Sequence, residues 1–281
     1  MIPASFDYLR PGTLKEAVGL LAEHGDDAKV LSGGHSLIPA MKFRLAQPAV
    51  VVDIGGIEKL RYIKEVGSKI AIGALATHHD IEASELIAKE CPLLAEVAPQ
   101  IGDVQVRNRG TLAGSLAHAD PAGDWPAAML ALDAEIHLVG PNGKRRVKAA
   151  EFFVDLMETA VQPEEIVSEI RVPKTGRSVS YLKFAQKASG FAIAGVAVVA
   201  DKKKGTAKIG VTGVAATAFR AAASEAELKK HKKLSKAAIK AAAALAMEGV
   251  DPMGDIHASE DYRAHLARVH TQRALELAVK R

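Results

Sequence analysis

The alternation of short strands and helices along this chain is interrupted once, at the polar stretch Lys174-Thr175-Gly176-Arg177-Ser178. After it come three strand-like runs in succession, at 179–186, 191–200 and 206–214, and then an alanine- and lysine-rich helical part. At 281 residues the chain is also long enough for two modest domains. The sequence therefore predicts an α+β protein with domains 1–175 and 176–281, the second a small three-stranded sheet covered by helices.

Local signals place the main elements. Thr13-Leu14-Lys15-Glu16 is a capping box, and the apolar spacing after it predicts a helix over about 13–24. Turn residues predict hairpins around Gly67-Ser68 and Pro141-Asn142-Gly143. We further expect strands at 29–31, 50–54 and 166–172 and helices at about 80–89, 237–247 and 260–279.

Composition excludes several classes of protein. The single cysteine, Cys91, allows no internal disulfide, thiolate zinc site or iron–sulfur cluster built from this chain alone. The formal charge is only +4, and the basic run at 229–233 has no interleaved aromatic residues, so we expect no nucleic-acid partner. No apolar stretch approaches the roughly 18 residues of a membrane span, and no export signal is visible. We expect a cytoplasmic protein with no membrane span.

Two short segments combine glycine with hydroxyl residues. The first glycine segment is Ser32-Gly33-Gly34-His35-Ser36, and the second is Thr111-Leu112-Ala113-Gly114-Ser115. We predict both to be open loops, because successive backbone N–H groups without side chains in the way can point into one concavity and bind a phosphate. An ordinary turn is the alternative for each. Neither G-x-G-x-x-G after a strand nor G-x-x-x-x-G-K-[ST] occurs, so neither a Rossmann nor a P-loop site is expected.

Other reactive side chains give no convincing constellation. His78 and His79 are adjacent, unlike the i, i+4 pair of a helical zinc site, so we expect no metal there. His118 and Asp120 have no nucleophile nearby, and we interpret them as scaffolding. Trp125 is expected to pack behind the second glycine segment. The sequence predicts no catalytic residue on this chain.

In order along nearly the whole chain, the motifs resemble those of the FAD-binding medium subunits of molybdenum hydroxylases, the family of carbon monoxide dehydrogenase and related aldehyde oxidoreductases. The shared motifs are P-A-S-F-D-Y (3–8), P-G-T-L-K-E-A (11–17), S-G-G-H-S-L-I-P (32–39), V-D-I (52–54), I-G-A (72–74), V-R-N-R-G-T (106–111), A-D-P-A-G-D-W-P (119–126), Y-L-K-F (181–184) and the helix from Tyr262 to Leu275.

The resemblance implies a two-part FAD-binding domain of the vanillyl-alcohol oxidase (PCMH) type, with subdomains of about 1–57 and 58–175, followed by the C-terminal domain of these flavoproteins. It implies that both glycine segments wrap the FAD diphosphate and that Asp124 lies at the ribityl or ribose hydroxyls. It further implies that Ile166 lines the adenine side and that Lys183 approaches the isoalloxazine.

The resemblance also implies a function. The chain would be the FAD-carrying electron-transfer subunit of a heterotrimer, with the molybdenum cofactor on a large partner subunit and the iron–sulfur clusters on a small one, and with two heterotrimers forming a dimer. One alternative is a self-contained FAD oxidase or reductase of the same superfamily acting on a small molecule. Another is a module that binds a nucleotide structurally and makes interactions.

One position departs from the family pattern. The second glycine segment usually has two adjacent glycines, whereas this chain has Ala113 before Gly114. If the backbone there needs a positive φ, alanine costs about 1 kcal/mol or more and the segment shifts. If φ is negative, nothing is lost.

Overall fold

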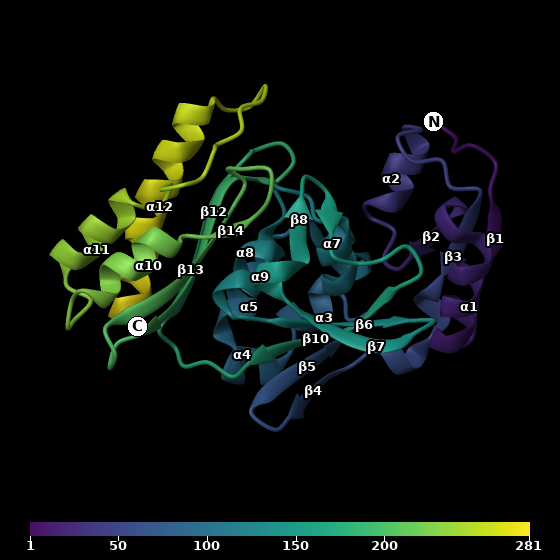
Figure 1. Cartoon of the computed structure of the whole chain (residues 1–281), viewed down its shortest axis with the longest axis horizontal. Helices are drawn as coiled ribbons and strands as arrows, with labels where there is room; N and C mark the ends of the chain where they lie inside the picture. Colours follow the sequence, from purple (N-terminus) through teal and green to yellow (C-terminus); the bar gives the residue numbers. More distant parts are fainter.

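The structure is a computed structural model that describes residues 1–281. Three sheets lie along the long axis of an elongated molecule, with the N-terminal sheet at one end and the C-terminal sheet at the other (Figure 1). None of the helices combines the length and the apolar character that crossing a bilayer requires.

The N-terminal part is a parallel sheet in the order β1-β3-β2 with two helices. Its elements are β1 (Asp7–Leu9), α1 (Leu14–His24), β2 (Ala28–Leu31), α2 (Leu37–Lys42) and β3 (Val50–Asp53). The predicted capping box is confirmed: the Thr13 hydroxyl accepts from the Glu16 N–H, and the Glu16 carboxylate accepts from the Thr13 N–H. Helix α1 buries Ala17, Val18 and Leu21, its apolar stripe.

The middle part is an antiparallel five-stranded sheet in the order β4-β5-β10-β6-β7. Its strands are β4 (Ile63–Val66), β5 (Lys69–Gly73), β6 (Glu135–Gly140), β7 (Gly143–Lys148) and β10 (Ile166–Pro173), and β8 (Phe153–Asp155) with β9 (Glu158–Thr159) forms a separate pair. Its helices are α3 (His78–Glu82), α4 (Glu85–Glu90), α5 (Pro92–Val97), α6 (Val104–Arg109), α7 (Leu112–His118), α8 (Asp124–Ala131) and α9 (Ala149–Phe152). Both predicted hairpins are confirmed as β4–β5 and β6–β7.

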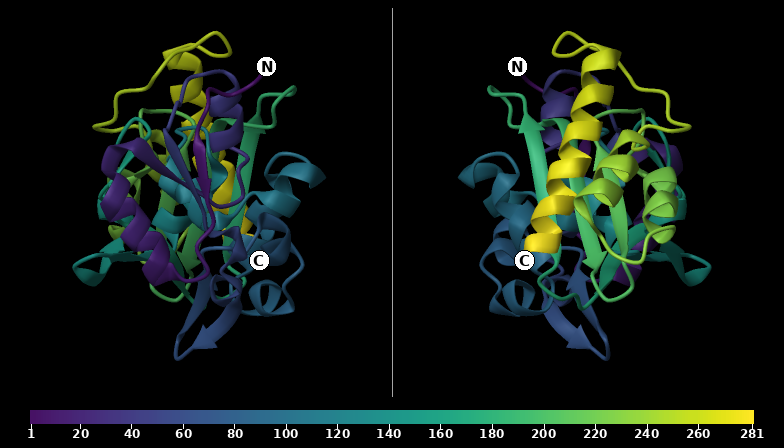
Figure 2. Two further views of the ribbon diagram at one scale, coloured as in Figure 1. Left: turned by 90° about the vertical axis from the view of Figure 1, so that its right-hand side faces the viewer. Right: turned by 90° about the vertical axis from the view of Figure 1, so that its left-hand side faces the viewer.

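The C-terminal part is an antiparallel sheet in the order β11-β12-β13-β14, with α12 lying along it (Figure 2). Its elements are β11 (Val179–Ala185), β12 (Ala192–Asp201), β13 (Thr206–Thr212), β14 (Phe219–Arg220), α10 (Ala222–Lys229), α11 (Lys236–Ala244) and α12 (Glu260–Lys280). The two-residue strand β14 joins the three predicted strands. It pairs with only Gly210 and Val211, which is too short a run for a period-2 pattern to reveal.

Two hydrophobic cores hold these parts together. One of 45 residues is continuous from α1 through the middle sheet, and a second of 22 residues lies between the C-terminal sheet and its helices. Helix α8, buried along its whole length, packs against β12 and β13. A Cβ on Gly210 would lie 2.0 Å from the Ala127 carbonyl oxygen, so a glycine is needed where β13 meets α8. The C-terminal part is therefore packed directly on the middle part.

The helix predicted at about 80–89 is wrong in detail. The structure has two short helices there, α3 and α4, separated at Ala83-Ser84. The Ser84 hydroxyl accepts from the Ile87 N–H and so caps the second helix. Ile81 in the first helix and Ile87 in the second are both buried, and no glycine or proline in 80–89 marks the break between the helices.

Candidate functional site

The first glycine segment connects β2 to α2 and lies outside any helix or strand. Gly34 has φ +79°, a conformation that favours glycine, whereas Gly33 has no positive φ. The backbone N–H groups of Gly33, Gly34, His35 and Ser36 form no hydrogen bond within the chain. Four consecutive donors are therefore free to bind an anion.

The second glycine segment is not the open loop that we predict from its sequence. Thr111 is the N-cap of α7, and Leu112-Ala113-Gly114-Ser115 is the first turn of that helix. The Thr111 hydroxyl accepts from the Gly114 N–H at 3.0 Å. Glycine and alanine tolerate both turn and helix, so composition alone did not reveal the helix start. Ala113 is helical with no positive φ, so it causes no backbone strain.

The two glycine segments lie against each other although they are far apart in the sequence. The hydroxyl oxygens of Ser32 and Thr111 are 3.1 Å apart and share a hydrogen bond. A Cβ on Gly33 would lie 2.1 Å from the Arg109 carbonyl oxygen and 2.9 Å from the Gly110 Cα. Gly33 therefore allows one backbone to lie directly on the other. The free N–H groups of the first segment therefore lie near the start of α7, where the Ala113 N–H is also unpaired.

Strand-like contacts from the middle part fix the second segment in position. Thr77 pairs with Thr111, the His78 N–H donates to the Gly110 carbonyl at 2.9 Å, and the Leu112 N–H donates to the Ala76 carbonyl at 3.3 Å. The site is therefore built on a rigid support and not on a mobile loop.

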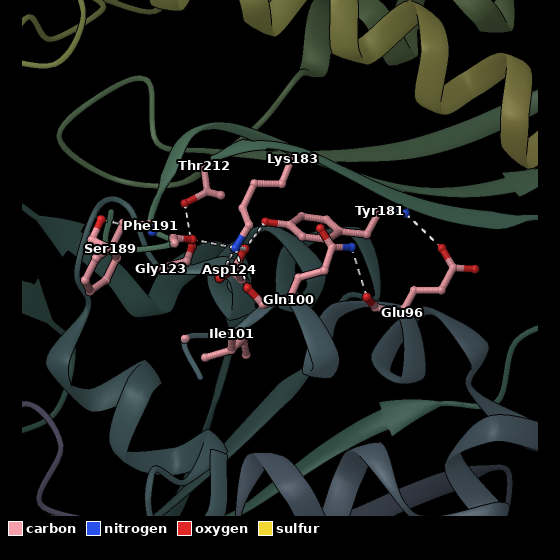
Figure 3. A network of polar contacts seen from close by, with 12 residues as sticks. Glu96, Gln100, Ile101, Gly123, Asp124, Tyr181, Lys183, Ser189, Phe191 and Thr212 are labelled. Atoms are coloured by element: carbon pink, nitrogen blue, oxygen red, sulfur yellow. Dashed lines mark hydrogen bonds and ion pairs between the residues drawn. The ribbon is translucent and has the colours of Figure 1, made fainter. Parts of the chain in front are cut away.

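Asp124, Lys183 and Tyr181 form a buried polar cluster (Figure 3). The Lys183 ammonium lies 2.9 Å from Asp124 Oδ1, and the Tyr181 hydroxyl donates to the same carboxylate. The side chains of Lys183 and Asp124 are only 4% and 6% exposed. Burial raises the pKa of the Asp124 carboxyl, and the ammonium opposes that rise. Burial next to Asp124 raises the pKa of Tyr181 well above its ordinary value, which keeps this tyrosine a proton donor.

Lys183 also links three segments of the chain through hydrogen bonds and an ion pair. Its ammonium donates to the carbonyls of Gln100 at 2.6 Å and Gly190 at 2.8 Å, in addition to Asp124 (Figure 3). All three N–H donors are thus in use. The turn at 186–190, which precedes the half-exposed Phe191, is held against the middle part by this lysine.

The C-terminal part also holds the segment between α7 and α8. The Thr212 hydroxyl contacts the carbonyls of Pro121 and Gly123 at 2.9 and 2.7 Å. The N–H groups of Gly213 and Ala192 donate to the carbonyls of Pro121 and Ala122. The C-terminal domain therefore helps to fix where Asp124 begins α8.

Comparison with known proteins agrees with this geometry. Residues 4–175 match the model of the FAD binding domain in molybdopterin dehydrogenase, and residues 179–278 match the CO dehydrogenase flavoprotein C-terminal domain. The chain belongs to the FAD-binding medium subunits of molybdenum hydroxylases. FAD is the cofactor of this flavoprotein, which is an oxidoreductase subunit.

Relatives of this medium subunit match it from end to end. It is 42% identical to the carbon monoxide dehydrogenase medium chain of Hydrogenophaga pseudoflava, over 99% of this chain and 98% of that one. It is 38% identical to the 6-hydroxypseudooxynicotine dehydrogenase complex subunit alpha of Paenarthrobacter nicotinovorans, over 100% of this chain and 97% of that one. A structure of the H. pseudoflava carbon monoxide dehydrogenase lacking the Mo-pyranopterin moiety superimposes with a TM-score of 0.96 at 43% identity, covering 100% of this chain and 99% of that one.

The remaining candidate residues of the medium subunit lie in different surroundings. Ile166 begins β10, and its side chain is only 2% exposed within the core, so a contact with a ligand would have to use its backbone. Trp125 is fully buried. Cys91 is also buried, and burial raises the pKa of its thiol to about 12. His118 ends α7, and the Asp120 carboxylate accepts from the Ala122 N–H, as scaffolding residues do.

Sequence reasoning missed Tyr181 as a partner of Asp124. A signal was present: Tyr181 and Lys183 are two residues apart on a strand and so share one face. Two polar side chains on the face of a strand that packs on the core indicate a buried polar partner.

Proposed function

We propose that this chain is the FAD-carrying electron-transfer subunit of a heterotrimeric molybdenum hydroxylase of the carbon monoxide or aldehyde dehydrogenase type. A large partner would hold the molybdenum cofactor and a small partner the iron–sulfur clusters, with two heterotrimers forming a dimer in the cytoplasm. The chain would accept electrons from the iron–sulfur subunit and pass them to a terminal acceptor. We assign residues 1–175, with subdomains of about 1–57 and 58–175, to FAD binding, and 176–281 to the C-terminal domain.

The observation that carries this proposal is the contact between the two glycine segments. Four free N–H groups, at Gly33, Gly34, His35 and Ser36, lie beside the capped start of α7. A side chain at Gly114 would come within 2.8 Å of the Thr111 hydroxyl, at the place where the segments touch. These residues fit a diphosphate, which needs several donors and close approach to the backbone.

The residues of the two glycine segments would bind the FAD diphosphate in different ways. The first segment would bind the diphosphate through its backbone N–H groups, and the hydroxyls of Ser32, Ser36 and Ser115 would add donors. Ala113 would act through its unpaired backbone N–H. Leu112, whose N–H already donates to the Ala76 carbonyl, would hold the first turn of α7 in place. Bound FAD would supply the exchange of electrons one or two at a time. The chain itself binds and orients it, and no proton transfer by a side chain is required.

The polar cluster would orient the rest of the cofactor. Asp124 Oδ2 receives only a 3.1 Å contact from Lys183, which leaves it able to accept from a ribityl or ribose hydroxyl. Because the Lys183 ammonium is fully engaged, its contact with the isoalloxazine would come from its alkyl stem. Ile166 would line the adenine side through its backbone.

The experiment compares the isolated chain with the complete enzyme. The purified chain, loaded with FAD and kept without oxygen, should retain the visible spectrum of oxidised flavin when carbon monoxide, an aldehyde or an N-heterocycle is added. In the holoenzyme purified from its native source, the true substrate should bleach that spectrum, and molybdenum and iron should co-purify.

Two other outcomes would contradict the proposal. Bleaching of the isolated chain by a substrate would indicate a self-contained oxidase or reductase. A chain that remains colourless after FAD is added and dialysed away would indicate the interaction module. End-to-end matches to medium chains favour neither of these alternatives.

A further inference from the structure

His78 lies directly beneath the junction of the two glycine segments. It is the first residue of α3 and is only 4% exposed. Its ring packs against Trp125 with centroids 5.9 Å apart, and the Trp125 indole N–H donates to His78 Nδ1 at 3.0 Å. An indole nitrogen can only donate, so Nδ1 must accept. The imidazole is therefore neutral, and its single proton is on Nε2.

The other ring nitrogen, Nε2, has no hydrogen-bond partner within the chain. A Cβ on Gly110 would lie 2.7 Å from this atom, so Nε2 lies against the Gly110 backbone. The Gly110 Cα in turn lies 2.9 Å from the Cβ position of Gly33. A donor without an acceptor is thus placed where the two segments meet. Nε2 is not fully enclosed by the surrounding protein atoms, so an acceptor from outside the chain can reach this unpaired donor.

The surroundings favour an anionic acceptor. Burial, with smaller contributions from the nearby His35 and Arg107, lowers the pKa of His78 to about 4. His78 therefore remains an uncharged donor at neutral pH. An oxygen of a phosphate group suits such a donor better than a cation does.

We propose that His78 Nε2–H donates a hydrogen bond to a diphosphate oxygen of FAD, and that Trp125 positions this donor by fixing the tautomer of the ring. The inference rests on the proposed function, in that it needs the diphosphate to lie at the junction of the two glycine segments. It adds a binding residue outside both segments, at a position where sequence reasoning considered only a metal.

Two substitutions distinguish the role of the Nε2–H donor from the role of the ring's shape. His78→Asn places an amide oxygen near the position of Nδ1, where it can accept from Trp125, but it cannot reach the position of Nε2. His78→Gln reaches that position with an amide N–H. A hydrogen bond to a charged group contributes roughly 1.5–3 kcal/mol, so H78N should bind FAD roughly 10- to 150-fold more weakly. H78Q should recover most of the affinity.

The probes are FAD, ADP and riboflavin, measured by titration calorimetry alongside the thermal unfolding of each variant. ADP carries the diphosphate without the flavin, so H78N should lose affinity for ADP as it does for FAD. Riboflavin has no phosphate, so its binding should not change. In protein labelled with ¹⁵N-histidine, the Nε2–H resonance of His78 should shift when FAD or ADP is added and should not shift with riboflavin.

The outcomes distinguish this inference from the proposed function. If the wild-type chain binds neither FAD nor ADP, the proposed function fails. If the wild type binds both and a folded H78N binds them equally well, the role of His78 is overturned and the proposed function stands. A folded H78Q as weak as H78N would also overturn it, because the ring would then matter for its shape and not for its donor.

Discussion

The substitution Gly33→Ala tests whether the two glycine segments must touch in order to bind FAD. The φ of Gly33 is not positive, so alanine brings no backbone strain there. The added Cβ would lie 2.1 Å from the Arg109 carbonyl oxygen, whereas ordinary contacts are near 3.5 Å. Since the nearest atoms belong to the backbone, they cannot rotate away. To restore an ordinary contact, the two segments would have to separate by about 1.4 Å.

The expected effect follows from this displacement. Overfilling a close contact typically costs about 1–3 kcal/mol. If that cost falls on the bound conformation of the site, the affinity for FAD decreases by roughly 5- to 150-fold. The hydrogen bond between the Ser32 and Thr111 hydroxyls, now at 3.1 Å, should break at the same time.

The assay uses the only tryptophan of the chain. Trp125 is buried behind the site, and bound flavin should quench its emission by energy transfer. The dissociation constant for FAD is read from this quenching.

The matched control is Gly19→Ala, in the middle of α1, where nothing lies within 4 Å of an added Cβ. G19A should bind FAD normally and be about 0.5–1 kcal/mol more stable. Wild-type affinity and stability in G33A would refute the importance of the contact.

Three further predictions follow from the structure. Lys183→Met leaves the buried Asp124 carboxylate without its cation and should lower the free energy of unfolding by roughly 3–5 kcal/mol in a urea titration; an unchanged midpoint would show that the pair is not buried in solution. His78 has a folded pKa of about 4, below its unfolded value of 6.5, so the unfolded state binds more protons in between. Stability should fall by about 3 kcal/mol as the pH drops through that window, and H78Q should show a flatter profile, measured by chemical unfolding at each pH. Ala113→Gly restores the usual family residue at a helical position and should destabilise the chain by about 0.5–1 kcal/mol without tightening FAD binding; tighter binding would mean that the backbone there changes conformation.

The sequence predicted those helices and hairpins whose ends are set by neighbouring residues. The Thr13 capping box fixed the start of α1, and the turns at Gly67 and Asn142 fixed two hairpins. The start of α7 was missed because its N-cap, Thr111, follows a glycine and is followed by small residues, a composition equally typical of a loop. The helix break at Ser84 was missed because no glycine or proline marks it.

The candidate site depends on contacts that no local pattern encodes. The sequence placed the first glycine segment after a predicted strand, but it does not say that Gly33 lies on Arg109 across 76 positions of sequence. The expectation that they converge came from the resemblance to the family. The buried partners of Lys183 could not be predicted either, since they come from three separate segments and two of them are backbone carbonyls.

Amide hydrogen exchange of the first glycine segment is the most direct measurement of how this chain holds its cofactor. With FAD, and also with ADP, exchange at Gly33, Gly34, His35 and Ser36 should slow, because their free N–H groups gain acceptors. Riboflavin, which lacks the diphosphate, should leave exchange at these four amides unchanged. Protection by riboflavin equal to that by FAD, or protection by FAD confined to other parts of the chain, would contradict the placement of the diphosphate between the two segments.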